Sequence, residues 1–120
     1  MPIVRIDIQS GKSTAYKRAI LHGVREAISS VLEVPEERVM QRIFESVPED
    51  IDAPGRQTDR LTMVDITMLS GRDAELKRAL YAEVVSRLGF EPGIEPADIM
   101  VVVHDPAPEC FCLGGTMPGV

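Results

Sequence analysis

The chain has 120 residues, of which 44% are hydrophobic and 27% are charged, a composition typical of one soluble globular domain. Its 13 basic and 19 acidic residues give a net charge of −6 without a basic tract, which argues against nucleic acid as the main partner. The sequence has neither a membrane-length apolar run nor a visible signal peptide, so we expect a cytoplasmic protein with no membrane partner.

The two cysteines, Cys110 and Cys112, are too few and too close together for a disulfide framework. With only His22 and His104 available, they do not build a zinc site either. We therefore expect reduced thiols and no bound metal.

The chain begins with a proline after the initiator methionine, and a predicted strand follows. Apolar and polar residues alternate through positions 3–9, the period of a strand with one buried face. Pro2 suits the first position of a strand because it has no N–H to contribute to the sheet. Removal of Met1 would leave its nitrogen as a free secondary amine. Since burial disfavours the ammonium, we expect a lowered pKa and proton exchange near neutral pH.

A helix is predicted from Ser13, a good N-cap, because the apolar residues up to position 32 fall on one helical face. A short turn of helix with Pro35 at its first position follows, and then a second strand over residues 39–45. This β-α-β order predicts parallel strands with a right-handed crossover. Residues 46–60 form a loop whose length is typical of functional or mobile segments.

The second half of the chain repeats the first at an offset of 60 residues without a gap. The repeated residues of the first half are Val4, Ile6, Ser10, Gly11, Lys17, Arg18, Ala19, Val24, Met40, Pro48 and Glu49. Ser13 is replaced by Asp73, another N-cap. We predict a single α/β domain over residues 1–120, made of tandem β-α-β units at about 1–45 and 61–105 and a C-terminal hairpin tail. Its four-stranded mixed sheet should carry both helices on one face.

The predicted fourth strand is apolar on both faces, as the run Met100-Val101-Val102-Val103 shows. One layer of helices covers only one face of a sheet, so we expect subunit association with closed cyclic symmetry to cover the other. At the offset of 60, Pro2 corresponds to Thr62, which has no free amine. Each chain should therefore hold one proline site. The sequence indicates no partner for His104, which ends this strand.

An amino-terminal proline, an alternating strand, Gly11-Lys12, a helix, Val34-Pro35 and a second strand, in this order, resemble the tautomerase superfamily. The first 45 residues are similar to 4-oxalocrotonate tautomerase. The doubled length, the Thr58-Asp59 segment, Ser70-Gly71-Arg72 and the tail at 110–115 are more similar to the malonate semialdehyde decarboxylase-like branch. The resemblance implies a homotrimer, no cofactor, and a proline amine at the bottom of a pocket that neighbouring subunits complete.

The resemblance also implies the candidate site residues. Pro2 is the catalytic base or acid, and Arg72, at the start of the second helix, binds and polarises the substrate. Lys12 stands where 4-oxalocrotonate tautomerase has a substrate-binding arginine, and it keeps the charge without the bidentate geometry. The tautomerase's second arginine falls on Met40, and the decarboxylase's aspartate falls on an arginine. Further substrate-binding candidates are therefore Arg38, Glu37, Arg42 and, from the tail, Phe111.

These residues favour a cofactor-independent tautomerase acting on a small anionic 2-oxo acid or its enol, with Pro2 as general base and nearby cations stabilising the enolate. Two alternatives remain open. One is a lyase or hydratase acting on a three-carbon oxo acid, with Pro2 as general acid. The other is a trimeric interaction domain without catalysis, because a fold does not fix a function.

Overall fold

The computed structural model describes residues 1–55 and 57–118, which form two β-α-β units that share one sheet. The first unit contains β1 (Ile3–Gln9), α1 (Thr14–Leu32) and β2 (Met40–Ser46). The second contains β3 (Thr62–Thr67), α2 (Ala74–Phe90) and β4 (Ile99–His104). Single 3-10 turns lie at Glu36–Arg38, Pro48–Asp50, Pro96–Asp98 and Pro108–Cys110. The predicted tandem α/β fold is confirmed.

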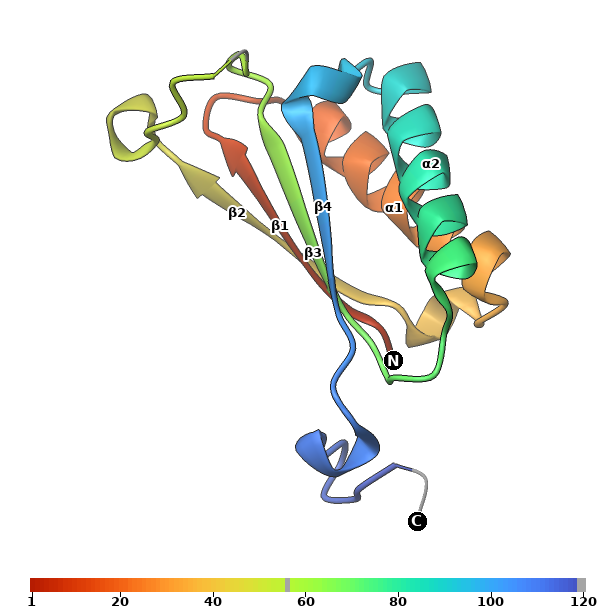
Figure 1. Cartoon of the computed structure of the whole chain (residues 1–120). Coiled ribbons are helices and arrows are strands. Elements are labelled where there is room, and N and C mark those ends of the chain that lie inside the picture. Colours follow the sequence, from red (N-terminus) through yellow and green to blue (C-terminus); the bar gives the residue numbers. More distant parts are fainter. Residues whose placement is uncertain (56, 119–120) are drawn as a thin grey trace.

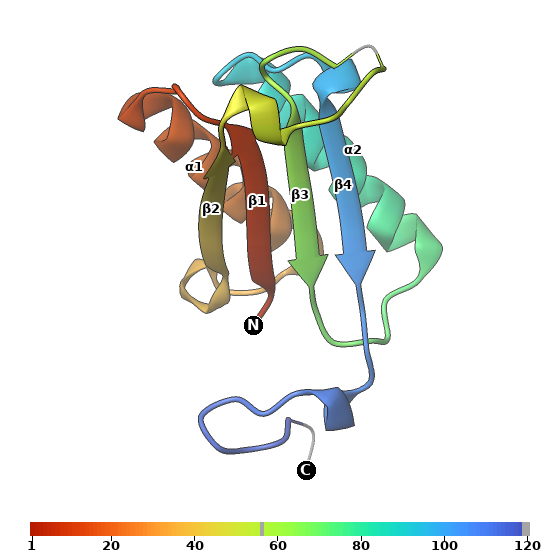
Figure 2. The same cartoon turned by 90° about the vertical axis from the view of Figure 1, so that its left-hand side faces the viewer.

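The strands lie in the order β2-β1-β3-β4, with parallel outer pairs and an antiparallel pair, β1 and β3, in the centre. Ile3 is opposite Met40 on one side and Thr67 on the other. The beginnings of β1 and β2 therefore lie at the same end of the sheet as the ends of β3 and β4 (Figure 2). We call this end the proline end and the opposite end, where residues 47–55 and 57–61 lie, the loop end.

Both helices cover the same face of the sheet, as predicted (Figure 1). The core between the helices and the sheet includes Val4, Ile6, Ile8, Ile20, Val24, Ala27, Ile28, Val64, Ile66, Leu80, Val84 and Leu88. Each valine, isoleucine or leucine side chain of this set contributes about 1.5–3 kcal/mol on burial. Within the described residues, neither helix is long and apolar enough to cross a membrane. We call the other face of the sheet the open face.

Local hydrogen bonds fix where the two long helices begin. The Ser13 hydroxyl accepts from the Tyr16 backbone N–H at 3.0 Å, and the Asp73 carboxylate accepts from the Leu76 N–H at 2.9 Å. Both predicted N-caps are confirmed. Pro35 has extended backbone, with ψ 140°, and is the N-cap of its short turn. The prediction that it occupies the first helical position was therefore off by one residue.

A buried carboxylate anchors the connection between the two units. Asp98 is 3% exposed and accepts hydrogen bonds from the Thr58 backbone N–H at 2.6 Å and the Thr58 hydroxyl at 2.7 Å. The Asp59 carbonyl nearby accepts from Lys12 Nζ at 2.8 Å. These contacts hold the chain in place as it enters β3.

We expect Asp98→Ala to lower the free energy of unfolding by about 1.5–3 kcal/mol, because the Thr58 N–H and hydroxyl lose a charged acceptor. Urea denaturation followed by far-UV circular dichroism measures the change. Asp59→Ala is the matched control, since Asp59 is exposed and its carboxylate lies 3.8 Å from Lys12 Nζ; an exposed pair of this kind contributes about 0.5 kcal/mol. Equal losses in the two variants would contradict the anchoring role of Asp98.

After β4 the chain leaves the body of the domain as an arm, residues 105–118 (Figures 1 and 2). The Cα radius of gyration is 14.8 Å, against about 13.6 Å for a compact chain of this length. The arm turns back where Leu113 and Thr116 pair, across Gly114 and Gly115 with positive φ angles. Such angles favour glycine. The arm begins at the proline end of the sheet.

Candidate active site

Pro2 is buried at the proline end, directly before β1. Its carbonyl accepts a hydrogen bond from the Met40 N–H at 3.0 Å, which ties the amino terminus to β2. Met1 precedes it, and the terminal amine donates to the Arg38 carbonyl. Burial lowers the pKa of this amine, and the positive charge of Arg38 lowers it further. The surroundings of the chain terminus thus favour a neutral amine.

Arg72 lies at the same end of the sheet because it follows β3, which runs antiparallel to β1. It is half-buried, and its Nη1 donates to the Leu69 carbonyl at 3.2 Å. Gly71 before it has a φ of 122°, a conformation that a side chain would strain. The short turn that carries Glu37 and Arg38 comes just before β2 and is exposed at this end as well. Two arginines are therefore at the same end of the sheet as the terminus.

The remaining substrate-binding candidates at or near the proline end, Phe111 and Arg42, lie on different segments. Phe111 belongs to the arm and is 9% exposed. Arg42 lies within β2, exposed on the open face, with its guanidinium 5.3 Å from the centre of the Phe44 ring. Arg5 of β1 stacks on the same ring at 3.9 Å. Arg42 is therefore farther along the sheet than Arg38, which adjoins the terminus.

Lys12 does not meet Pro2 within one chain. It follows β1, so it lies at the loop end, about 20 Å along the strand from Pro2. Its side chain is 12% exposed, and its ammonium is bound to Asp59. The reason is topological: α1 starts at the far end of β1, whereas α2 starts where β3 returns to the proline end. At the offset of 60, Lys12 is the counterpart of Arg72. It lies at the same end of the sheet as Thr62, the counterpart of Pro2, and not at the end where Pro2 lies.

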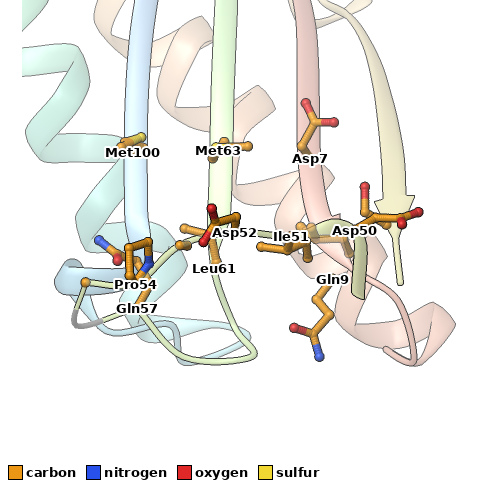
Figure 3. Close-up of a pocket in the computed structure, with 14 residues that line it drawn as sticks. Asp7, Gln9, Asp50, Ile51, Asp52, Pro54, Gln57, Leu61, Met63 and Met100 are labelled. Atoms are coloured by element: carbon orange, nitrogen blue, oxygen red, sulfur yellow. The ribbon is translucent and has the colours of Figure 1, made fainter. Parts of the chain in front are cut away.

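A cavity of about 410 Å³ lies at the loop end, on the open face (Figure 3). Met63 and Met100 lie side by side on neighbouring strands, and Ile51, from the loop between β2 and β3, lines the same cavity. The lining also contains the carboxylates of Asp7, Asp50 and Asp52. This cavity is therefore acidic and lies away from Pro2.

The repeat relates this cavity to the proline end. At the offset of 60, Leu61, Thr62 and Met63 correspond to Met1, Pro2 and Ile3. The three acidic lining residues correspond to uncharged ones, namely Thr67, Cys110 and Cys112. Asp98 corresponds to Arg38, so a buried acid at the loop end becomes a cation at the proline end. The two ends share a backbone plan, but the described cavity at the loop end is lined by carboxylates, whereas Arg38 and Arg72 lie at the proline end.

Sequence reasoning missed one pair of titratable residues. His104 Nε2 lies 3.1 Å from Asp65 Oδ1, on the open face, although the sequence indicated no partner for His104. In the register of β3 and β4, Thr67 is opposite His104 and Asp65 is opposite Val102. Asp65 and His104 are thus diagonal neighbours on one face. Only a correct strand register could have found this pair.

The fold and the chain terminus together define a class: a fused pair of β-α-β units with a proline at the start of the first strand and arginines at the same end of the sheet. A family model described as "Tautomerase enzyme" matches residues 40–114. The chain belongs to this tautomerase family.

The relatives agree with this assignment. The chain is 25% identical over 119 residues to the probable tautomerase YusQ of Bacillus subtilis (strain 168), covering 95% of this chain and 94% of that protein. A crystal structure of FG41 malonate semialdehyde decarboxylase is 25% identical, with a TM-score of 0.85 over 93% of this chain and 88% of that one. Native fused 4-OT has the same fold at 21% identity, with a TM-score of 0.87 over 96% and 94%.

Proposed function

We propose that this chain is a cofactor-independent tautomerase that interconverts the keto and enol forms of a 2-oxo acid, with the Pro2 amine as general base. One observation carries the proposal: burial and Arg38 lower the pKa of the terminal amine at this position. After removal of Met1, the same surroundings would act on the Pro2 nitrogen. A lowered pKa increases the fraction of neutral amine, which is the form that acts as a base, whereas the decarboxylase alternative requires an ammonium.

The site residues then take the following roles. The guanidinium of Arg72 binds the substrate carboxylate through charge-assisted hydrogen bonds. The Pro2 nitrogen takes the proton of the enol oxygen, and the oxygen lone pair re-forms the carbonyl. The electrons of the C2=C3 double bond bind a proton at C3. Arg38, with Glu37 beside it, and Arg42 are the candidates to stabilise negative charge on the oxygen, and Phe111 covers the substrate.

The working unit in this proposal is a homotrimer. Fused 4-OT structures are described as trimers. On the open face of this chain, Met40, Met63, Met100 and Val102 are 63%, 37%, 51% and 45% exposed. Packing three open faces around an axis would remove these apolar side chains from water.

The test is the ketonisation of phenylenolpyruvate, an aryl enol of pyruvate, by protein with a mass-verified Pro2 terminus. We expect catalysis that increases with pH through the pKa of the Pro2 amine, because only the deprotonated amine is a base. Release of CO2 from malonate semialdehyde, measured on the same sample, tests the lyase alternative that the 25% identical decarboxylase suggests. Decarboxylation that decreases as pH rises, without ketonisation, would contradict the tautomerase proposal.

A further inference from the structure

We propose that His104, positioned by Asp65, is a second proton-transfer residue of the Pro2 site and donates the proton that C3 receives. The inference rests on the proposed function, which names the Pro2 nitrogen as the acceptor of the enol proton. It adds that the donor of the C3 proton is the imidazole of His104.

His104 lies at the proline end of the sheet. Thr67 is opposite His104 on one side and opposite Ile3 on the other, so these three residues form one row across β4, β3 and β1. Neighbouring strands are about 4.8 Å apart, which puts His104 roughly 10 Å from the residue that follows Pro2. An imidazole reaches several ångströms from its backbone. A small acid between the two groups could therefore contact both.

The pair is accessible and oriented. In the single chain the side chains of His104 and Asp65 are 54% and 39% exposed; because His104 ends β4, the proposal requires that the packed open faces of the trimer leave this end of the sheet open to a substrate. The Nε2···Oδ1 distance of 3.1 Å allows a hydrogen bond that fixes the ring plane. A carboxylate on one ring nitrogen leaves the other nitrogen, Nδ1, for proton transfer.

Two cations near this pair, Arg5 and Lys77, are bound to carboxylates other than Asp65. Arg5 is opposite Asp65 in the sheet, but its guanidinium donates to Asp7, at 3.1 Å from Nε and 3.3 Å from Nη2. Asp105, the residue after His104, accepts from Lys77 of α2 at 2.6 Å. Among the described charged residues around His104, Asp65 is the one in hydrogen-bond contact with the ring.

The first repeat has no such pair. At the offset of 60, His104 corresponds to Phe44 and Asp65 to Arg5. These two residues also touch, with the Arg5 guanidinium 3.9 Å from the centre of the Phe44 ring, but neither can exchange a proton near neutral pH. The same position in the fold thus holds a stacking pair in one unit and an acid–base pair in the other. The acid–base pair lies at the end that carries Pro2.

In both ketonisation and enolisation, the substrate loses one proton and gains one. In ketonisation the neutral Pro2 nitrogen takes the enol O–H proton, and the imidazolium of His104 gives its proton to C3 as the C2=C3 electrons form the new C–H bond. In enolisation the neutral imidazole removes the C3 proton, and the Pro2 ammonium protonates the oxygen. Solvent resets both groups between turnovers.

The test compares the only two histidines of the chain. His104→Gln should lower kcat for phenylenolpyruvate ketonisation by about 10²-fold, with KM within about threefold, because the lost group acts on the proton and not on the carboxylate. The part of the kcat–pH profile that depends on a protonated donor should disappear. His22→Gln is the matched control, since His22 is 71% exposed on α1, on the other side of the sheet; it should leave kcat unchanged.

Asp65 variants separate positioning from packing. Asp65→Asn should lower kcat about tenfold, and Asp65→Glu should recover part of the loss. The ¹⁵N spectrum of the two histidines should show a changed tautomer ratio at His104 alone in Asp65→Asn. Light scattering checks that each variant keeps the oligomeric state of the parent.

The outcomes are distinct. If His104→Gln keeps kcat while blocking the Pro2 amine abolishes it, the His104 inference is wrong and the proposed function stands. If blocking Pro2 has no effect, the proposed function itself fails. Loss of assembly in His104→Gln, with full activity in both Asp65 variants, would make His104 an interface residue and overturn the inference.

Discussion

Protein with a glycine inserted between Met1 and Pro2 should lose about 10³-fold in kcat/KM for enol ketonisation. The insertion makes the Pro2 nitrogen an amide, whose lone pair is delocalised into the carbonyl and is not basic. The strand should be unaffected, because the Met40 N–H bonds to the Pro2 carbonyl and not to its nitrogen. Mass spectrometry of the mature termini and a stopped-flow assay of ketonisation provide the measurement.

Pro2→Ala is the control for this experiment, since it also starts with a free amine after removal of Met1. It should retain more activity than the inserted variant, because a primary amine can still accept a proton. Its optimum pH should shift according to the basicity of the new amine. Full activity in the inserted variant would rule out the Pro2 nitrogen as the base.

Arg72→Gln should raise KM for the same substrate about 10–100-fold, because a hydrogen bond to a charged group is worth roughly 1.5–3 kcal/mol. The KM of Arg72→Lys should lie between those of the parent protein and Arg72→Gln, since an ammonium keeps the charge without the planar geometry of a guanidinium. Initial rates over a wide range of substrate concentration separate the effect on KM from that on kcat. The methyl ester of the substrate, which has no carboxylate, should show little difference between parent and variant.

Two further substitutions make the Arg72 result specific. Arg78→Gln removes the same charge from an exposed position on α2 and should leave KM within about twofold, since exposed charges interact weakly. Lys12→Gln tests whether a neighbouring chain brings its lysine to the site. A KM increase in Arg78→Gln as large as in Arg72→Gln would show a general effect of charge and would contradict carboxylate binding by Arg72.

The sequence predicted the fold well because its signals are local or repeated. Period-2 alternation located β1, the helical face and the caps Ser13 and Asp73 located both helices, and the offset of 60 implied the second unit. The position of Arg72 relative to Pro2 followed from family resemblance. The antiparallel pairing of β1 with β3 now gives its physical reason.

The parts that the sequence could not predict depend on contacts between segments far apart in the chain. Lys12 has the right charge and the right place in its own unit, but the direction of β1 takes it to the loop end. His104 and Asp65 are 39 residues apart and meet only through the register of β3 and β4. The arm has no periodicity from which its path away from the sheet could be inferred.

The division of the site between the two units has a consequence for how the protein responds to dilution. In the proposed site the first unit of the chain would supply the amine at Pro2, and the second would supply Arg72 and the pair of His104 with Asp65. A covalent linker, held at Thr58 by Asp98, keeps these groups together at an effective concentration that does not depend on how much protein is present. Two separate half-length chains would have to associate before the Pro2 amine and Arg72 could lie in one site. In the fused chain, that encounter is completed once, during folding.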